Sequence, residues 1–327
     1  MLAELLPLFA SLVTALVLEA MPFLALGAII SGLVEVYAPA DLASRRLPSS
    51  PAGQILTGLF AGMILPTCEC GSVPIVRRFL HKGVPARTAI TYMLAAPVVN
   101  PVVLASTWTA FKGDWGMVLA RVGLVVLPAA VIGLALGRAK PQELLRFSLA
   151  PSPAASPHDH GHGHDHGPGC GCGCAPVPGK SRMVSALSIA ANEFLETSAF
   201  LILGGCAAAL FKVLTPASAV SAFAGNLPLA VAALMFLAVA LTVCSEADAF
   251  VAVSFTAFPD AAKAAFIAIG PMVDLKLIAL YLLVFRRRVA ASLIIAPVVM
   301  VYVLALALGL APGLAPGLAP GLAGVRP

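Results

Sequence analysis

Charged side chains are scarce in this sequence of 327 residues. Only 11% of the residues are Asp, Glu, Lys or Arg, whereas 60% are hydrophobic. A water-exposed domain carries roughly 25% charged residues, and one core in a chain of this length cannot hide so much apolar surface. The composition therefore excludes an ordinary soluble protein, and we expect lipid to cover much of the surface.

The sequence also lacks the short motifs of common membrane enzymes and pumps. It contains no H-E-x-x-H zinc motif, no G-x-S-x-G motif and no Walker A loop. We therefore expect no enzymatic activity, and a metalloprotease, a serine hydrolase and an ATP-driven pump are each disfavoured. The apolar N-terminus has no basic segment ahead of it, so a cleaved signal peptide is not expected.

Apolar runs recur along the chain at lengths suited to a bilayer, whose hydrocarbon core of ~30 Å is crossed by about 20 helical residues. Six full spans are predicted, at 8–34, 88–108, 115–137, 183–210, 264–284 and 289–311. The apolar stretches 54–80 and 228–257 are interrupted by polar residues and are predicted to be broken re-entrant hairpins, with full spans as the alternative. The predicted fold class is an all-α, polytopic membrane protein.

Basic residues gather in the predicted loops and at helix ends. Fourteen of the 20 Lys and Arg residues fall on one face if both hairpins enter and leave on the same side. They are Arg45, Arg46, Arg77, Arg78, Lys82, Arg87, Arg138, Lys140, Arg146, Lys180, Arg182, Arg286, Arg287 and Arg288. Since cytoplasmic loops are enriched in Lys and Arg, this face is predicted to be cytoplasmic. The same placement argues against nucleic acid as a partner.

Three segments recur in the same order in the two halves of the chain. They are Glu19–Gly27 with Glu196–Gly204, Leu65–Cys70 with Leu241–Glu246, and Ala96–Asn100 with Gly270–Asp274. Because three spans per half invert the second copy, the sequence predicts two inverted repeats, a recurring plan of secondary transporters. The predicted boundaries are a first repeat at 1–137, a linker at 138–182, a second repeat at 183–311 and a low-complexity tail at 312–327.

The strongest local signal is Pro-Thr-Cys-Glu-Cys-Gly-Ser-Val-Pro at 66–74. Residues two apart point to nearly opposite faces of a helix but to the same face of an extended segment. Three helix breakers are expected to keep the segment irregular: Pro66, Gly71 and Pro74. Thiolates suit Cu(I), Zn(II) and trivalent arsenic, so Cys68, Glu69 and Cys70 are predicted to bind the substrate. Packing of both cysteines as small buried hydrophobes is the alternative.

Further polar residues interrupt the apolar stretches, where charge is costly and indicates function. Those predicted to join the substrate site are Cys244, Glu246, Asp248, Asn100 and Asp274, although the acids at 246 and 248 are also suited to capping a short helix. Asp274 and Lys276 are two residues apart and are not expected to face each other along one helix.

Glu19 and Glu196 lie in the middle of matching spans. A carboxyl group in apolar surroundings holds its proton more readily than in water. Both residues are therefore predicted to couple proton movement to transport.

The linker carries a dense run of potential metal ligands. They are His158, His160, His162, His164, His166, Cys170, Cys172 and Cys174. These residue types bind Zn, Cu and Ni, and the intervening glycines impose no fixed geometry. We predict a labile chelator, since an expression tag would lack the cysteines and sit at a terminus. No resident cofactor is predicted; Cu or Zn is expected only as transported or linker-bound ion.

The runs Leu65–Ile75, Lys82–Pro85 and Ala96–Pro101 resemble the bacterial predicted-permease family that includes the trivalent organoarsenical efflux permeases. The His- and Cys-rich linker is similar to that of the branch assigned to copper and zinc efflux. The resemblance covers residues 1–311. It implies an inner-membrane efflux permease in which Cys68 and Cys70 belong to the substrate path.

These features predict a secondary transporter that exports Cu(I) or Zn(II) from the cytoplasm. Trivalent arsenic or organoarsenicals are the alternative substrate. A membrane thiol-redox protein is the alternative of another class, although C-x-C is not the usual C-x-x-C redox spacing. The expected partners are the lipid bilayer and the ion, with a homo-oligomer left open.

Overall fold

The computed structural model describes residues 2–37, 47–65, 67–146, 182–214 and 224–310. Within those ranges the chain is helical, and the extended pairing there is an isolated antiparallel bridge between Leu145 and Phe285. The predicted all-α fold class is confirmed. Most of the predicted linker and all of the predicted tail lie outside the described residues.

In each half, among the described helices, a long helix is followed by four short ones and a second long one. The first half contains α1 (Leu2–Tyr37), α3 (Pro51–Ile64), α4 (Glu69–His81), α5 (Ala86–Ala95), α6 (Pro101–Ala110) and α7 (Trp115–Leu136), then the single turn α8 (Pro141–Leu144). The second half contains α9 (Arg182–Leu214), α11 (Leu227–Leu241), α12 (Asp248–Ser254), α13 (Asp260–Ile269), α14 (Leu275–Val284) and α15 (Arg287–Leu310).

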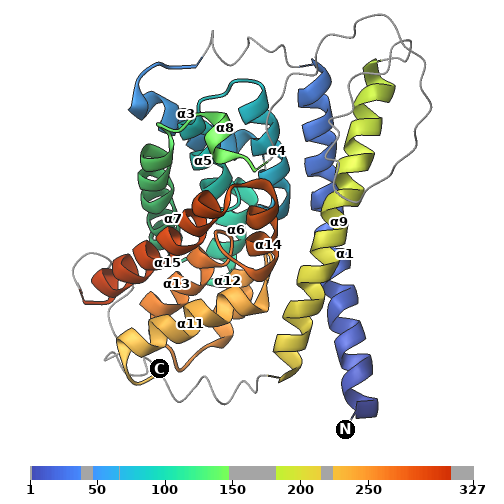
Figure 1. Cartoon of the computed structure of the whole chain (residues 1–327). Coiled ribbons are helices and arrows are strands. Elements are labelled where there is room, and N and C mark those ends of the chain that lie inside the picture. Colours follow the sequence, from blue (N-terminus) through green and yellow to red (C-terminus); the bar gives the residue numbers. More distant parts are fainter. Residues whose placement is uncertain (1, 38–46, 66, 147–181, 215–223, 311–327) are drawn as a thin grey trace, which may run out of the picture.

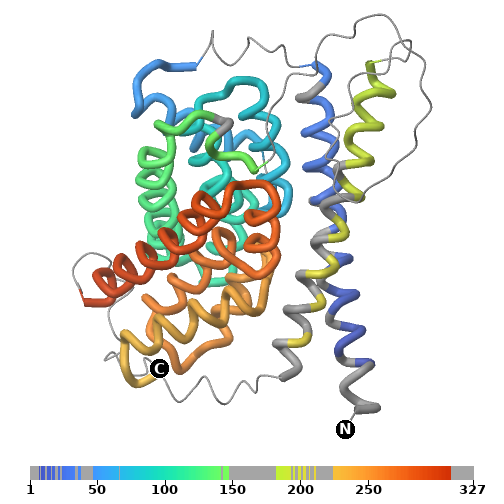
Figure 2. The backbone as a smooth tube through the Cα atoms, viewed as in Figure 1, coloured from blue at the N-terminus to red at the C-terminus, as the bar shows by residue number. Residues whose placement is uncertain are grey.

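The long helices α1 and α9 lie side by side and run in opposite directions (Figure 1). The other helices form a bundle beside this pair, as the backbone trace shows (Figure 2). Helix α1 packs against α4, and α9 packs against α14. Each long helix of the pair therefore covers a short helix that follows a helix break, meaning a short non-helical segment between two helices.

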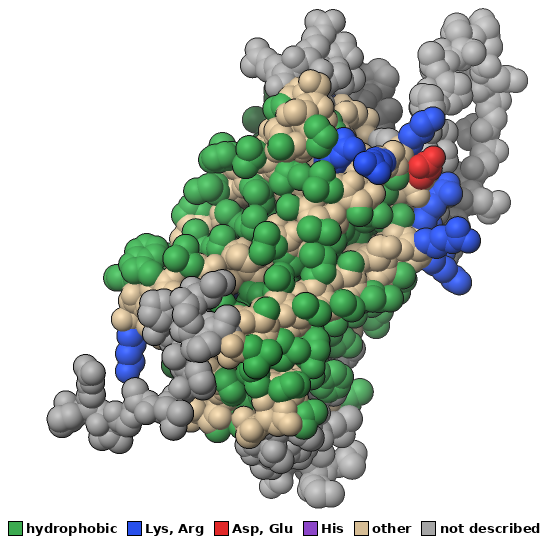
Figure 3. All heavy atoms as spheres, turned by 90° about the vertical axis from the view of Figure 1, so that its left-hand side faces the viewer, with side chains coloured by type: hydrophobic (Ala, Val, Ile, Leu, Met, Phe, Trp, Pro, Cys, Tyr) green, Lys and Arg blue, Asp and Glu red, His purple; other side chains and the backbone are tan. Residues whose placement is uncertain are grey.

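The outer surface is apolar, whereas polar and charged side chains are buried. Large hydrophobic side chains are exposed along the outer helices, among them Leu119, Leu127, Ile295, Val299 and Val303. Figure 3 shows one face covered by hydrophobic side chains, with Lys and Arg side chains at its edges. This distribution is opposite to that of a soluble protein and suits a surface covered by lipid. In the described part, α7 and α15 are long and apolar enough to cross a membrane.

Two predicted spans, 88–108 and 264–284, are not continuous helices. The first is divided into α5 and α6 by residues 96–100, and the second into α13 and α14 by residues 270–274. The prolines at 97, 101 and 271 lack the N–H that an uninterrupted helix requires. Asn100 caps α6 by accepting a hydrogen bond from the Val102 N–H at 2.9 Å. Asp274 caps α14 by accepting one from the Leu277 N–H at 2.6 Å.

The stretches 54–80 and 228–257 are interrupted as the sequence predicts. The first is α3 and α4 separated by residues 65–68, and the second is α11 and α12 separated by residues 242–247. Thr242 ends α11 in a left-handed conformation, with φ of 49°. Each stretch thus contains one helix break, which lies near the predicted polar motif.

Candidate functional site

The helix breaks of one half face those of the other half. Helix α4, which follows the first break, packs against α14, and α6 packs against α12. In an apolar environment, irregular backbone is stable only where protein or a cavity surrounds it. The candidate site lies where these four short helices begin.

The C-x-C motif straddles the start of α4. Cys68 is the extended residue before the helix, with φ −71° and ψ 167°, and Cys70 lies in the first turn. The two thiols are within hydrogen-bonding reach of each other, and each residue is 4% exposed. Leu24 of α1 and Phe194 of α9 pack against them. Both long helices therefore cover the thiol pair.

The predicted extent of the irregular segment was wrong on its C-terminal side. Gly71 and Pro74 lie inside α4, and the break ends at Cys68. The fixed φ of proline is compatible with a helix, and its effect there is to remove one N–H donor. The N–H removed at position 74 is the one that would bond to the carbonyl of Cys70. A single extended residue is enough to bring the thiols together.

Glu69 lies at the centre of the polar cluster and is 1% exposed. Its Oε1 is 3.4 Å from Lys276 Nζ, and its Oε2 accepts a hydrogen bond from Ser245 Oγ at 3.4 Å. Lys276 Nζ also lies 3.4 Å from Asp274 Oδ2. The ammonium is within electrostatic range of Cys70 and Cys244 as well. One lysine thus connects acids and thiols from both halves.

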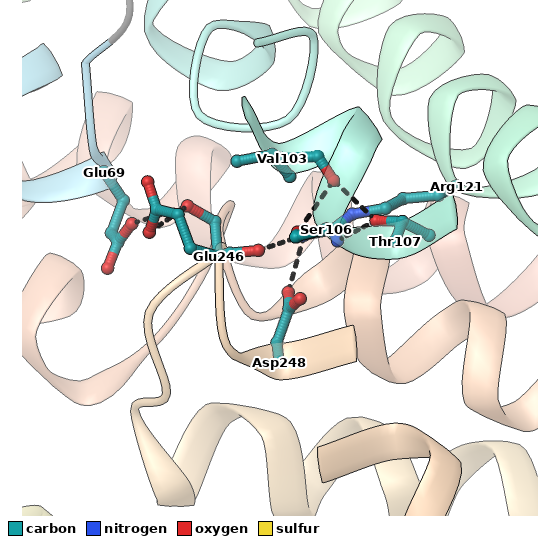
Figure 4. Close-up of polar contacts among 8 residues, drawn as sticks. Glu69, Val103, Ser106, Thr107, Arg121, Glu246 and Asp248 are labelled. Atoms are coloured by element: carbon teal, nitrogen blue, oxygen red, sulfur yellow. Dashed lines mark hydrogen bonds and ion pairs between the residues drawn. The ribbon is translucent and has the colours of Figure 1, made fainter. Parts of the chain in front are cut away.

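A second ion pair joins Arg121 and Asp248 (Figure 4). Arg121 of α7 donates to Asp248 Oδ2 at 2.7 Å and to the Ser245 carbonyl at 3.0 Å. It also donates to Thr107 Oγ1 at 2.7 Å. Glu246 and Glu69 lie near this pair, with Ser245 Oγ 3.4 Å from Glu246 Oε2. The two ion pairs form one continuous buried network.

The predicted substrate residues divide into three groups. Glu69, Cys70, Cys244 and Asp274 lie around Lys276, and Cys68 is within hydrogen-bonding reach of Cys70. The acids Glu246 and Asp248 lie on the arginine side of the network.

Asn100 is buried and caps α6. Glu19 and Glu196 belong to α1 and α9, but their side chains lie outside the described residues, as do all the predicted linker ligands from His158 to Cys174.

Sequence reasoning missed the cations of the site. Asp274 and Lys276 were not expected to face each other, yet they form an ion pair. The reason is that Asp274 precedes α14 and is extended, with φ −139° and ψ 173°. Arg121 is one of the six basic residues outside the predicted cytoplasmic face, and the sequence reasoning gave it no role. Its position inside the predicted span 115–137 was the available signal, since a charge there indicates function.

The network has an excess of acids. It joins four carboxylates, those of Glu69, Glu246, Asp248 and Asp274, to two cations, those of Arg121 and Lys276. Fully ionised, it carries a formal charge of −2 and favours a cation. Among the described residues, no three His, Cys, Asp or Glu side chains are arranged to hold a metal ion together.

Comparison with known proteins adds a family to this geometry. A family model described as "Predicted permease" matches residues 5–310. The chain is 36% identical over 263 residues to a putative two-component membrane permease complex subunit of Streptococcus mutans serotype c, covering 80% of this chain and 82% of that protein. It is 34% identical over 293 residues to the UPF0718 protein YcgR of Bacillus subtilis, covering 89% and 93%. No solved structure matches the chain.

Proposed function

The chain belongs to the predicted permease family, and on that premise we propose that it is a secondary transporter of the bacterial inner membrane that exports Cu(I) or Zn(II) from the cytoplasm. One observation carries the proposal. Lys276 lies between Glu69 and Asp274 and within electrostatic range of Cys70 and Cys244, so acids and thiols of both halves meet at one buried point.

The composition of the site favours a soft cation. Thiolate ligands suit Cu(I) and Zn(II), and carboxylates are also ligands of Zn(II). Trivalent arsenicals are the alternative substrate, because the thiols of Cys68 and Cys70 are soft ligands that also suit trivalent arsenic. The excess of carboxylates in the network supports the metal cation over a neutral arsenical.

Several structural relationships support the proposed inverted repeat. Helices α1 and α9 run antiparallel (Figure 1). Asn100 and Asp274, which match in the sequence alignment, each cap the second half of a broken helix. Transporters with inverted repeats form their substrate sites from such discontinuous helices near the bilayer midplane. We propose that the halves move about the site to open it to each side in turn.

The proposed partners are the lipid bilayer and the transported ion. The Streptococcus mutans relative is named as a subunit of a two-component complex, so we extend the proposal to a second membrane subunit, with a homo-oligomer as the alternative. Co-purification of the full chain with its native membrane neighbours distinguishes the two.

A thiol-redox function is the second candidate, supported by the hydrogen-bonding proximity of Cys68 and Cys70. Thiol labelling before and after mild oxidant separates the two functions. A redox protein forms a reversible disulfide, whereas a carrier has its thiols protected by metal.

Transport into inverted membrane vesicles tests the proposal. We expect uptake of Zn(II) or Cu(I) that depends on the full chain, measured with a panel of ions with and without an imposed pH gradient. Cys68→Ser and Cys70→Ser should each abolish uptake in protein that still inserts. Cys206→Ser, on α9 and outside the cluster, is the matched control and should transport normally. Equal uptake by all three variants would refute the role assigned to the thiol pair.

A further inference from the structure

The two buried cations of the site are held in different ways. Arg121 makes three hydrogen bonds, and its contact with Asp248 is 2.7 Å. Lys276 is 3.4 Å from both Glu69 and Asp274. Charge-assisted N–H···O bonds are normally about 2.7–2.9 Å. The arginine is therefore fixed in its network, whereas the lysine is loosely held between two acids.

The ammonium of Lys276 occupies the point where the candidate substrate ligands converge. Glu69 reaches it from the first half and Asp274 from the second, and each acid is 1% exposed. Asp274 Oδ2 faces the ammonium and makes no hydrogen bond within the described residues. Cys70 and Cys244 lie within electrostatic range of the same nitrogen. A cation bound by these groups would compete with the lysine for the same oxygens.

We infer that Lys276 is an internal competitor of the transported cation, an inference that rests on the proposed function. In the empty site its ammonium neutralises part of the charge of Glu69 and Asp274. When the cation binds, the lysine side chain moves aside on its flexible four-carbon stem. The competition weakens binding and speeds release on the far side of the membrane. It also keeps the buried acids compensated while the carrier returns empty, since an unpaired buried charge is strongly destabilising.

Conservative variants of Asp274 and Lys276 separate the effect of their charges from the effect of the helix cap that Asp274 makes. Asp274 Oδ1 caps α14, and asparagine caps helices as well as aspartate does. Asn100 performs this role at the start of α6. Asp274→Asn therefore removes one negative charge and keeps the cap. Combined with Lys276→Gln, it restores the formal charge of the original site.

The experiment is isothermal titration of purified full-length protein in detergent with Zn²⁺ and with Ag⁺, a stand-in for Cu(I). Every protein carries asparagine for the linker histidines and serine for the linker cysteines, so that linker binding does not obscure the site. We expect Lys276→Gln to bind at least about tenfold more tightly than the unmodified site, because a like charge beside the ligands is removed. Asp274→Asn should bind at least about tenfold more weakly, and the double variant within about threefold of the unmodified site.

Lys263→Gln is the matched control, because Lys263 pairs with Asp260 at 2.9 Å on α13 and lies away from the network. The affinity of this variant for the ions should equal that of the unmodified site. If Lys276→Gln does not fold, the double variant is compared with Asp274→Asn, which it should exceed at least about threefold in affinity. Equal or weaker binding when the lysine is removed overturns this inference alone. Failure of the unmodified site to bind either ion overturns the proposed function, and this inference with it.

Discussion

Arg121 of α7 and Asp248 of α12 form a buried ion pair between the two halves of the chain, with 2.7 Å between Nη2 and Oδ2. The two side chains are 0% and 2% exposed. Arg121 also binds the carbonyl of Ser245 in the break that precedes α12. The pair therefore fixes the position of the second-half break against α7. A charge buried this deeply is tolerated only because its partner is present.

The ion pair predicts a specific pattern of stability. Arg121→Met and Asp248→Leu should each lower the free energy of unfolding by about 3–5 kcal/mol, because each leaves a buried charge without a partner. The double variant should be more stable than either single variant. Thermal unfolding of the purified proteins in detergent measures the order.

The control for this cycle is Lys263→Met, which removes the partly exposed partner of Asp260. An exposed pair contributes about 0–1 kcal/mol, so this variant should unfold close to the original temperature. Single variants at Arg121 and Asp248 that match the control would show that the pair does not hold the halves together.

The sequence was sufficient to predict the helical class and two of the four helix breaks at the site. Apolar length and helix-breaking residues act locally, so 54–80 and 228–257 were correctly expected to be interrupted. The same rules wrongly predicted that Pro74 interrupts the helix, whereas it lies inside α4. They also failed to predict the helix break at 96–100, where proline divides a predicted span.

The polar network depends on contacts that are distant in sequence. Glu69 and Lys276 are separated by 207 positions, and no local pattern specifies which acid meets which cation. The ion pair of Asp274 and Lys276 was missed because the cap residue is extended, so helical geometry does not apply to it. Neither cation was given a role from the sequence, and the packing of α4 on α14 and of α6 on α12 assigns their partners.

A close contact between α1 and α4 gives a second prediction. A Cβ atom placed on Gly27 would lie 3.0 Å from the Cα of Gly71, next to the C-x-C motif. Gly27→Val should therefore destabilise the protein by about 1–3 kcal/mol by overpacking and reduce ion uptake. Gly123→Val on α7 is the matched control, since nothing lies within 4 Å of a Cβ there. Thermal unfolding and vesicle uptake of both variants are compared. Equal behaviour would show that α1 does not pack tightly on the site.

The third prediction concerns the side of the membrane on which the linker lies. Residues on either side of the isolated bridge are joined by hydrogen bonds from Arg146 N–H to the Val284 carbonyl at 3.0 Å and from Arg286 N–H to the Leu144 carbonyl at 2.9 Å. Exposed basic residues gather near the bridge, after α7 and at the start of α15: Arg138, Lys140, Arg146, Arg286, Arg287 and Arg288. By the positive-inside rule, residues 158–174 should be cytoplasmic.

A membrane-impermeant maleimide tests this orientation in a Cys206→Ser background. Cys170, Cys172 and Cys174 should be protected in intact cells and labelled after permeabilisation. Efficient labelling in intact cells would invert the topology and place the linker outside the cytoplasm.

The last prediction concerns the contribution of the linker to transport. A glycine-spaced His and Cys tract binds metal but cannot shape a translocation path, because no predicted span includes it. Its expected effect is to raise the metal concentration near the cytoplasmic mouth, by an amount that depends on tether length. Deletion of residues 158–174 should therefore raise the apparent KM for metal and leave the maximal rate nearly unchanged, which separates binding from turnover. Uptake into inverted vesicles over a range of metal concentrations measures both. A linker of equal length without its histidines and cysteines controls for the tether itself and should behave like the deletion. Loss of transport at every concentration would instead make the tract an obligatory part of the pathway.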